Sequence, residues 1–313
     1  MVLSVAVCNL NVVPASHTSE MLLTKNFVKA KNPCAAGYRW FIRDHQGQGD
    51  YQEILDALVL AGRLDDACWL LDQFGPTDAV LELDSVDAEA IVFAGTLVVR
   101  MGINVDTLVR AGAGIRTGGG IRAGTAIIAG DGISADGNLA SGGSIRAGGD
   151  IMAGWGIDAE TTLDCGGNLR AKWDVCTGQG MSVQGNIQVG QSLIAGAGIV
   201  CGQGIKTGER LQAGESVQAE RGIQAGASIQ VGNHLEAGWG IQAGDDIVAD
   251  GGIRAGEGVV SAGCIEPGSG HGVYAGLRVR LDAWDVSARV MARERPAQLV
   301  SGYWCETEET LAA

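Results

Sequence analysis

The chain has 313 residues, of which 50 are glycine and five are proline. Glycine at about twice its average share, without a Gly-X-Y period, excludes a collagen triple helix. A hydrophobic share of 46% excludes a flexible low-complexity chain. The net charge of −14 comes from 22 basic and 36 acidic residues spread along the chain, so we expect no direct binding to nucleic acid.

The first residues predict a short strand rather than a targeting segment. The stretch MVLSVAVCNLNVV is apolar, but it lacks a basic residue and is interrupted by Asn9 and Asn11, which argues against a signal peptide. The sequence contains no apolar run of about 18 residues, so it predicts no membrane span. The eight cysteines lack CxxC spacing, so we expect neither a zinc site nor a disulfide framework. Free thiols favour a cytoplasmic location.

Residues 33–75 predict helices. Apolar residues recur at three- and four-residue spacing in this block, and glycines stand where two of the helices should end. We expect residues 1–80 to form a domain made of one strand and a helical cap. Bulky Phe93 and Val99 occupy positions that later hold small residues, which indicates that the cap covers the open end of the next domain.

Residues 81–268 carry a repeat of six residues. From Ile91 to Ile265, thirty successive positions at this spacing hold a large apolar residue. From Val99 to Ser261, the position two residues later always holds Ala, Val, Ser, Thr or Cys. The unit I-x-A-G-x-x predicts a three-residue strand and a glycine-rich corner, and its repetition predicts a β-solenoid. The rarity of proline agrees with this fold, because each strand N–H must bond to the neighbouring turn and proline has no N–H.

One corner in three indicates the length of a turn. The position just before every third anchor holds only glycine, asparagine or aspartate, the residues that best tolerate positive φ. We therefore predict a mainly β fold: a single-stranded parallel β-helix of about ten three-sided turns of 18 residues, with a left-handed residue at that corner. These corner residues are Gly114, Gly132, Asp150, Asn168, Asn186, Gly204, Gly222, Gly240 and Gly258.

Residues 269–313 predict a short C-terminal β cap or an oligomerisation segment. The anchor series fails at His271, and residues 277–291 alternate between apolar and polar like one or two ordinary strands. A homo-oligomer could form through residues 277–291 or through the solenoid ends, whose backbone groups would otherwise be unpaired.

The hexad units, such as IRAG at 121–124, resemble those of two families. The three short sides per turn are similar to hexapeptide-repeat acyltransferases, although in those the small inward residue precedes the large one. That resemblance implies acyl transfer in a trimer, with a histidine at a cleft between subunits. The array also resembles bactofilin-like solenoids, which implies a non-enzymatic bacterial protein that polymerises. The helical block resembles short modules that precede repeat domains in other bacterial proteins. The residues that carry this resemblance are Cys34, Trp40-Phe41, Tyr51 and Trp69-Leu70-Leu71.

Candidate catalytic groups are few. His234 at a corner and His271 after the last regular turn are the histidines that an acyltransferase could use as a base. No insertion interrupts the hexads to build a substrate pocket. Cys165 and Cys201 share an inward column, which indicates core packing rather than metal binding. We therefore predict no catalytic residue, no metal, no cofactor and no enzymatic activity.

Two surface features predict binding. Trp155 and Trp173 are 18 residues apart and stack on one corner of adjacent turns, where they either mark a binding patch or cover the glycine backbone. The second feature is an outward column without acidic residues, which is either a structural glutamine ladder or a docking face for a protein partner or another copy. Its candidate binding residues are Arg116, Arg170, Gln188, Lys206, Gln224 and Gln242.

These features favour a non-enzymatic, rigid scaffold that binds a protein partner or assembles with itself. One alternative is an inhibitor that mimics duplex DNA, which requires acidic side chains in columns along the solenoid. A second alternative is a hexapeptide-type acyltransferase.

Overall fold

The computed structural model describes residues 21–279 and 282–306, so the strand expected in MVLSVAVCNLNVV lies outside the described residues. The repeat forms a parallel β-solenoid of about 12 turns of about 18 residues, which confirms the predicted fold and the predicted length of a turn. The count exceeds ten because strands before Ile91 and after Ile265 extend the stack. The chain divides into two compact units, Met1–Asp136 and Gly137–Ala313.

The first unit begins with a helical block. Three of its helices start at residues whose side chains accept backbone N–H groups: Thr24, Cys34 and Asp50. Gly75, at φ 78°, ends the last helix. Two short antiparallel strands join the block. The elements are β1 (Leu22–Thr24), α1 (Lys25–Ala30), α2 (Ala35–Asp44), β2 (Gln48–Asp50), α3 (Tyr51–Leu60) and α4 (Leu64–Phe74).

The rest of the first unit is built from three parallel sheets, one for each side of a turn. One sheet contains β3 (Val80–Leu83), β6 (Thr96–Val99), β9 (Ile115–Thr117) and β12 (Ile133–Ala135). The next contains β4 (Val86–Ala88), β7 (Ile103–Val105) and β10 (Ile121–Ala123). The third contains β5 (Ile91–Phe93), β8 (Leu108–Ala111) and β11 (Ala126–Ala129).

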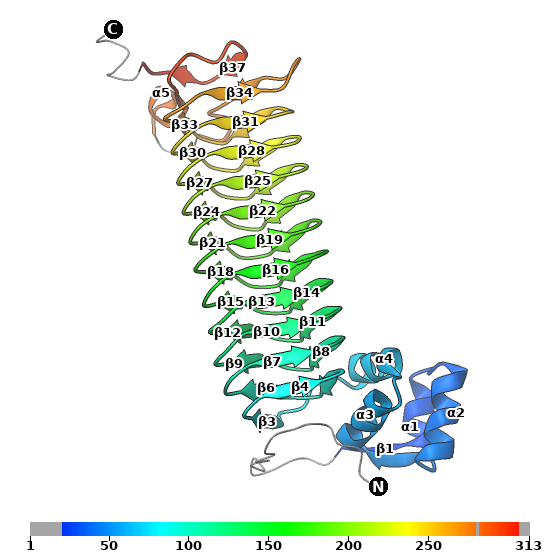
Figure 1. Ribbon diagram of the computed structural model, residues 1–313. Helices are drawn as coiled ribbons and strands as arrows, with labels where there is room; N and C mark the ends of the chain where they lie inside the picture. Colours follow the sequence, from blue (N-terminus) through cyan, green and yellow to red (C-terminus); the bar gives the residue numbers. More distant parts are fainter. Residues whose placement is uncertain (1–20, 280–281, 307–313) are drawn as a thin grey trace. The chain divides into compact units, whose positions relative to one another are not determined.

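The helices α3 and α4 lie beside β5 and β8 (Figure 1). Outward-facing Val92 is only 2% exposed because the helical block covers it. Gln52 bridges α3 to β5: its Nε2 donates to the Val92 carbonyl at 3.1 Å, and its Oε1 accepts the Ala94 N–H at 2.9 Å. This contact is made from the side of the turns, which differs from the expected cap over the end next to Phe93. The apolar outward residues of the first turns, Val92 and Ile128, decide the side.

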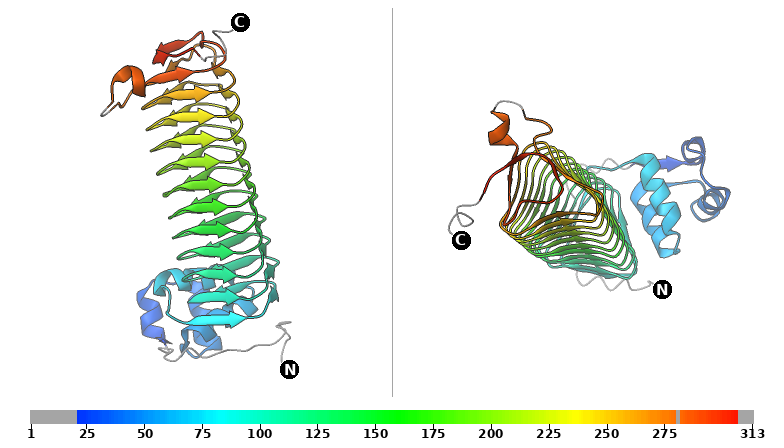
Figure 2. Two further views of the ribbon diagram at one scale, coloured as in Figure 1. Left: turned by 90° about the vertical axis from the view of Figure 1, so that its left-hand side faces the viewer. Right: turned by 90° about the horizontal axis from the view of Figure 1, so that it is seen from above.

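The second unit continues the same three-sided pattern, and its turns lie on one another when viewed along the stack (Figure 2). One sheet of the second unit contains β13 (Leu139–Ser141), β16 (Ile157–Ala159), β19 (Val175–Thr177), β22 (Leu193–Ala195), β25 (Leu211–Ala213), β28 (Ile229–Val231), β31 (Ile247–Ala249) and β34 (Ile265–Pro267). The second contains β14 (Ser144–Ala147), β17 (Leu163–Cys165), β20 (Met181–Val183), β23 (Ile199–Cys201), β26 (Val217–Ala219), β29 (Leu235–Ala237), β32 (Ile253–Ala255), β35 (Val273–Tyr274) and β37 (Leu299–Ser301). The third contains β15 (Ile151–Ala153), β18 (Leu169–Ala171), β21 (Ile187–Val189), β24 (Ile205–Thr207), β27 (Ile223–Ala225), β30 (Ile241–Ala243), β33 (Val259–Ser261), β36 (Arg289–Met291) and β38 (Tyr303–Trp304).

The hexad positions have the predicted roles. In the pair β27–β30, Ile223 faces Ile241 and Ala225 faces Ala243, so each residue stacks on the one 18 positions away. The isoleucine and leucine anchors are almost fully buried, and the small residues two positions later line the same bore. The position between them points outward and is mostly exposed. On each side of the solenoid, the core therefore contains a column of large side chains beside a column of small ones, and both columns run from turn to turn.

The predicted left-handed corner is wrong. Positive φ occurs at Asn32, Gln46 and six glycines among the described residues, and none of these is one of the nine predicted corner positions. Instead, an oxygen of Asn168 accepts the N–H of Asn186 at 3.0 Å, and Asn186 accepts that of Gly204 at 3.2 Å. Short amide and carboxylate side chains stand there because they satisfy the backbone N–H of the next turn.

Among the described residues of 277–291, one of the expected strands is present, at β36. Trp284–Ser287 forms the short helix α5, which stands out beside the stacked turns (Figure 2). The backbone N–H of Arg278 donates to Gly256 O at 2.8 Å, so the chain still follows the preceding turn before α5 begins. The alternating pattern does not predict this region correctly because residues 277–279 and 282–288 lie in an enlarged corner between β35 and β36, rather than on a side of a turn. β35 to β38 continue the parallel stack.

Candidate functional site

The outward column predicted as a binding face is continuous through β18, β21, β24, β27 and β30. Strand pairing places Arg170 beside Gln188, Gln188 beside Lys206, Lys206 beside Gln224 and Gln224 beside Gln242. All five side chains are exposed. Neighbouring strands are about 4.8 Å apart, so the column presents one polar group per turn at that spacing. We call the outward side of these five strands the glutamine face.

The glutamine face forms the floor of a groove of about 710 Å³. The floor includes all five residues of the column. Beside them lie Gly204, Gly222, Gly240 and Gly258, whose missing side chains leave the backbone bare. A Cβ on Gly222 would lie 3.3 Å from the Gly240 carbonyl oxygen, so close stacking of the turns favours glycine here. The groove therefore follows from the corner glycines and the flat strand face together.

One rim of the groove is formed by residues that the sequence patterns did not single out. The Arg221 guanidinium lies 5.4 Å from the ring centroid of Trp239, which has 44% exposure, and both stand on the corner before this sheet. The enlarged corner at α5 adds Val286, Ser287 and Arg289 at the far end. A signal for Arg221 and Trp239 is their 18-residue spacing, the same relation that links Trp155 to Trp173.

The groove is electropositive in an acidic chain. Arg170, Lys206, Arg221 and Arg289 line it, and none of the described residues that line it is aspartate or glutamate. A second hollow of about 510 Å³ shares Arg170, Gln188 and Lys206 and adds Lys172, again without a carboxylate in its described lining. These five cations form no ion pair within residues 21–279 and 282–306. Their charges are free to attract an anionic ligand.

The predicted tryptophan pair is stacked. The rings of Trp155 and Trp173 are 5.8 Å apart between centroids and inclined by 11°, and the side chains are 52% and 54% exposed. They stand on the corner that follows β15 and β18, on the opposite edge of the sheet from Trp239. Neither ring lines the groove or the second hollow.

Arg116 lies outside this site. It is on β9 of the first unit, exposed and in register with Val98 and Ser134. Trp155, Trp173 and Arg116 are thus the predicted binding residues that do not line the groove, whereas Arg170, Gln188, Lys206, Gln224 and Gln242 all do.

The two candidate histidines are brought together, but in a structural setting. The rings of His234 and His271 are 5.3 Å apart and inclined by 81°. The Nδ1 of His234 accepts the Gly252 N–H at 2.9 Å, so this nitrogen continues the ladder of corner side chains that bind the next turn. A nitrogen already used in that way is poorly available as a base.

The inward cysteines are part of the bore. Cys165 and Cys201 each lie beside Val183, and each thiol donates to a carbonyl oxygen, at 3.3 Å for Gly149 and 3.2 Å for Gly185. Burial raises the pKa of both thiols, which keeps them protonated and unreactive. Across the described ranges, no cluster of three or more His, Cys, Asp or Glu residues could hold a metal ion.

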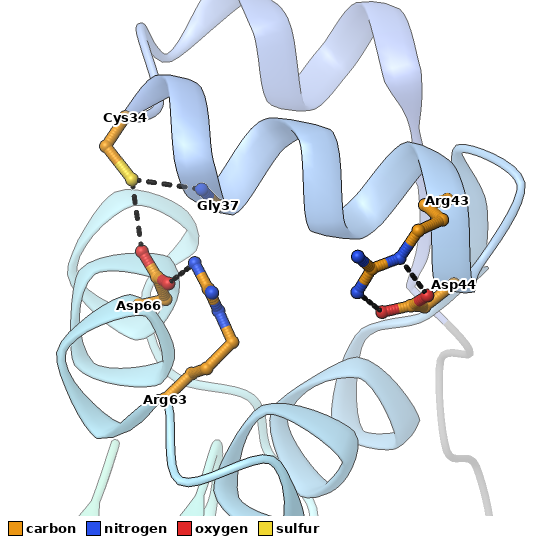
Figure 3. Close-up of polar contacts among 6 residues, drawn as sticks. All are labelled: Cys34, Gly37, Arg43, Asp44, Arg63 and Asp66. Atoms are coloured by element: carbon orange, nitrogen blue, oxygen red, sulfur yellow. Dashed lines mark hydrogen bonds and ion pairs between the residues drawn. The ribbon is translucent and has the colours of Figure 1, made fainter.

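The helical block has its own polar contacts (Figure 3). Cys34 Sγ accepts the Gly37 N–H at 3.1 Å and donates to Asp66 Oδ1 at 3.3 Å, and the other oxygen of that carboxylate, Oδ2, pairs with Arg63. On its other side, the block is joined to β8 by an ion pair between Asp72 and Arg110. Only 14% of the Arg110 side chain is exposed, so this pair serves as a docking contact of α4 rather than as an open site.

A comparison with protein families assigns only the helical block. A family model described as the YdhT N-terminal domain matches residues 21–74, which end in the last helix of the block. No curated protein and no solved structure matches the chain. Among the described residues, no helix is long and apolar enough to cross a membrane.

Proposed function

We propose that the protein is a non-enzymatic scaffold that binds a protein partner through the glutamine face. The observation that carries the proposal is the groove on that face, in which four cations and four amides form one continuous lining, with no carboxylate among the described lining residues. Parallel strands paired turn by turn hold these side chains at fixed spacing, so the face is preorganised for a partner.

The geometry gives less support to the two alternatives. Acyl transfer needs a free base near a substrate pocket, whereas His234 accepts a backbone N–H at a corner. A mimic of duplex DNA needs continuous acidic columns, whereas the only carboxylates in the outward columns of the second unit's three sheets are Asp158, Asp164, Glu236 and Glu266, no two of them neighbours in one column. The most regular exposed column is instead basic and amidic.

The test is co-purification with variants of the face. The double variant R170Q/K206Q removes two charges from the groove floor, and R122Q/R146Q removes the same number from the other two faces. We expect the protein partner retained by the wild-type chain to be lost from the first variant and kept by the second, since the charge change is matched. Retention of the same partner by R170Q/K206Q would contradict the proposal.

A further inference from the structure

The spacing of the cations on the glutamine face selects a particular backbone conformation in the partner. Arg170 and Lys206 lie two turns apart in one column, with Gln188 between them. Two strand spacings of about 4.8 Å place these cations about 9.6 Å apart along the stack. A polyproline II helix rises about 3.1 Å per residue with three residues per turn, so its side chains at every third residue recur at about 9.3 Å. In an extended β-strand, same-side residues recur at only about 6.7 Å.

The uncharged groups of the groove suit the same conformation. A polyproline II backbone has no internal hydrogen bonds, so its carbonyl groups remain free to accept from side-chain amides. Gln188, Gln224 and Gln242 supply such donors in three of the five turns of the column. Proline-rich segments in this conformation pack against aromatic rings in shallow grooves. Trp239 provides an exposed ring at the rim, with the Arg221 guanidinium beside it for a further carboxylate.

We infer that the groove binds a polyproline II segment of an acidic protein, with a carboxylate at every third residue. This inference rests on the proposed function and specifies the partner's chemistry. Arg170 and Lys206 each bind one carboxylate, the glutamines of the same column bind the peptide backbone, and Trp239 packs against proline. The bare strip at Gly204, Gly222 and Gly240 leaves room for the peptide chain. The absence of carboxylates from the described lining favours this anionic ligand over a neutral one.

The experiment measures binding of the full chain to short labelled peptides by fluorescence anisotropy. One peptide has Glu-Pro-Pro repeats, a second has the same composition with its glutamates in one block, and a third has lysine in place of glutamate. We expect the regular peptide to bind best, the blocked one roughly fivefold more weakly, and the lysine peptide not at all. Affinity should also fall between about 0.05 and 0.5 M salt, because exposed charges are screened.

Variants connect the binding to the groove. R170Q/K206Q should weaken the regular peptide about tenfold, and W239A about threefold, whereas R122Q/R146Q should bind like the wild type. Circular dichroism checks that each variant is folded. Equal affinity for the regular and blocked peptides, or an unchanged affinity in R170Q/K206Q, would overturn the inference.

Three further outcomes decide between the inference and the proposed function. Preference for an acidic oligosaccharide or single-stranded DNA over the regular peptide would replace the peptide ligand and overturn the inference. If no peptide binds while the protein partner is still lost from R170Q/K206Q, the scaffold function stands and the polyproline II inference fails. If neither result depends on these residues, both proposals fail.

Discussion

The Gly202→Val variant is expected to lose about 3 kcal/mol of its free energy of unfolding through overpacking at a corner. Gly202 occupies the fourth position of its hexad, and its N–H donates to the Val183 carbonyl at 2.8 Å. A Cβ there would lie 2.3 Å from the carbonyl oxygen of Gln184 in the previous turn. That oxygen is a backbone atom, so it cannot move away as a flexible side chain would.

The neighbours of Gly202 make this position more restrictive than a corner glycine that has glycine in the turns on both sides. In the sequence from 94 to 268, the fourth hexad position holds residues other than glycine in places, but never in two successive turns of one corner. Gly202 lies between Gln184 and Glu220, whereas Gly226 lies between Gly208 and Gly244. A corner with a side chain therefore requires glycine in the turns on both sides.

Gly226→Val is the matched control. Its Cβ would also approach the preceding carbonyl, at 2.0 Å from Gly208 O, but both adjacent corners are glycine and can adjust as they do beside other side chains. We expect a loss of about 1 kcal/mol. Urea unfolding followed by circular dichroism measures both variants. Equal losses would show that the neighbouring corners do not matter, and a fully stable Gly202→Val would contradict the stacking explanation.

The Ala225→Phe variant is expected to destabilise the protein by about 2 to 3 kcal/mol through overpacking. Ala225 is 3% exposed and stacks between Thr207 and Ala243 in the column of small inward residues. The large anchors fill the rest of the bore, so an aromatic ring can be placed only by displacing backbone or distorting rotamers. Hydrogen exchange should become faster in β24, β27 and β30 more than in distant turns.

Gln224→Phe is the control for this prediction. Gln224 is the preceding residue on the same strand, but its side chain points outward and is exposed. The same ring placed there should change the free energy of unfolding by no more than about 0.5 kcal/mol. A loss of stability at Gln224 equal to that at Ala225 would contradict the assignment of the bore.

The hexad pattern predicted the turns, their length and the direction of each strand residue, because each repeat has to bury the same side chains against the next. It did not predict why the corners need their residues. The residue types at Asn168 and Asn186 predict positive φ, whereas in the structure their side chains accept the backbone N–H of the following turn and their φ is not positive. Composition alone cannot separate these causes, because both favour glycine, asparagine and aspartate.

The elements outside the repeat were predicted less well for a related reason. The apolar faces of α3 and α4 were apparent, but the side of the solenoid that they cover depends on Val92 and Ile128, two outward residues of one sheet. In the candidate site, too, the residues on strands were predictable and the residues on corners were not. The floor of the groove follows from one regular column, whereas Arg221, Trp239 and Arg289 reach its rim from corners, where side-chain direction does not follow the strand alternation.

The most direct test of the scaffold account places one photo-crosslinking residue, benzoylphenylalanine, on each side of a single turn. Gln218, Gln224 and Gln230 are equivalent exposed positions on β26, β27 and β28, so they differ only in the face that they present. The account predicts that the protein partner crosslinks at Gln224 alone and that the crosslink disappears in R170Q/K206Q. Crosslinking of equal yield at all three positions, or at Gln218 or Gln230 instead of Gln224, would contradict it.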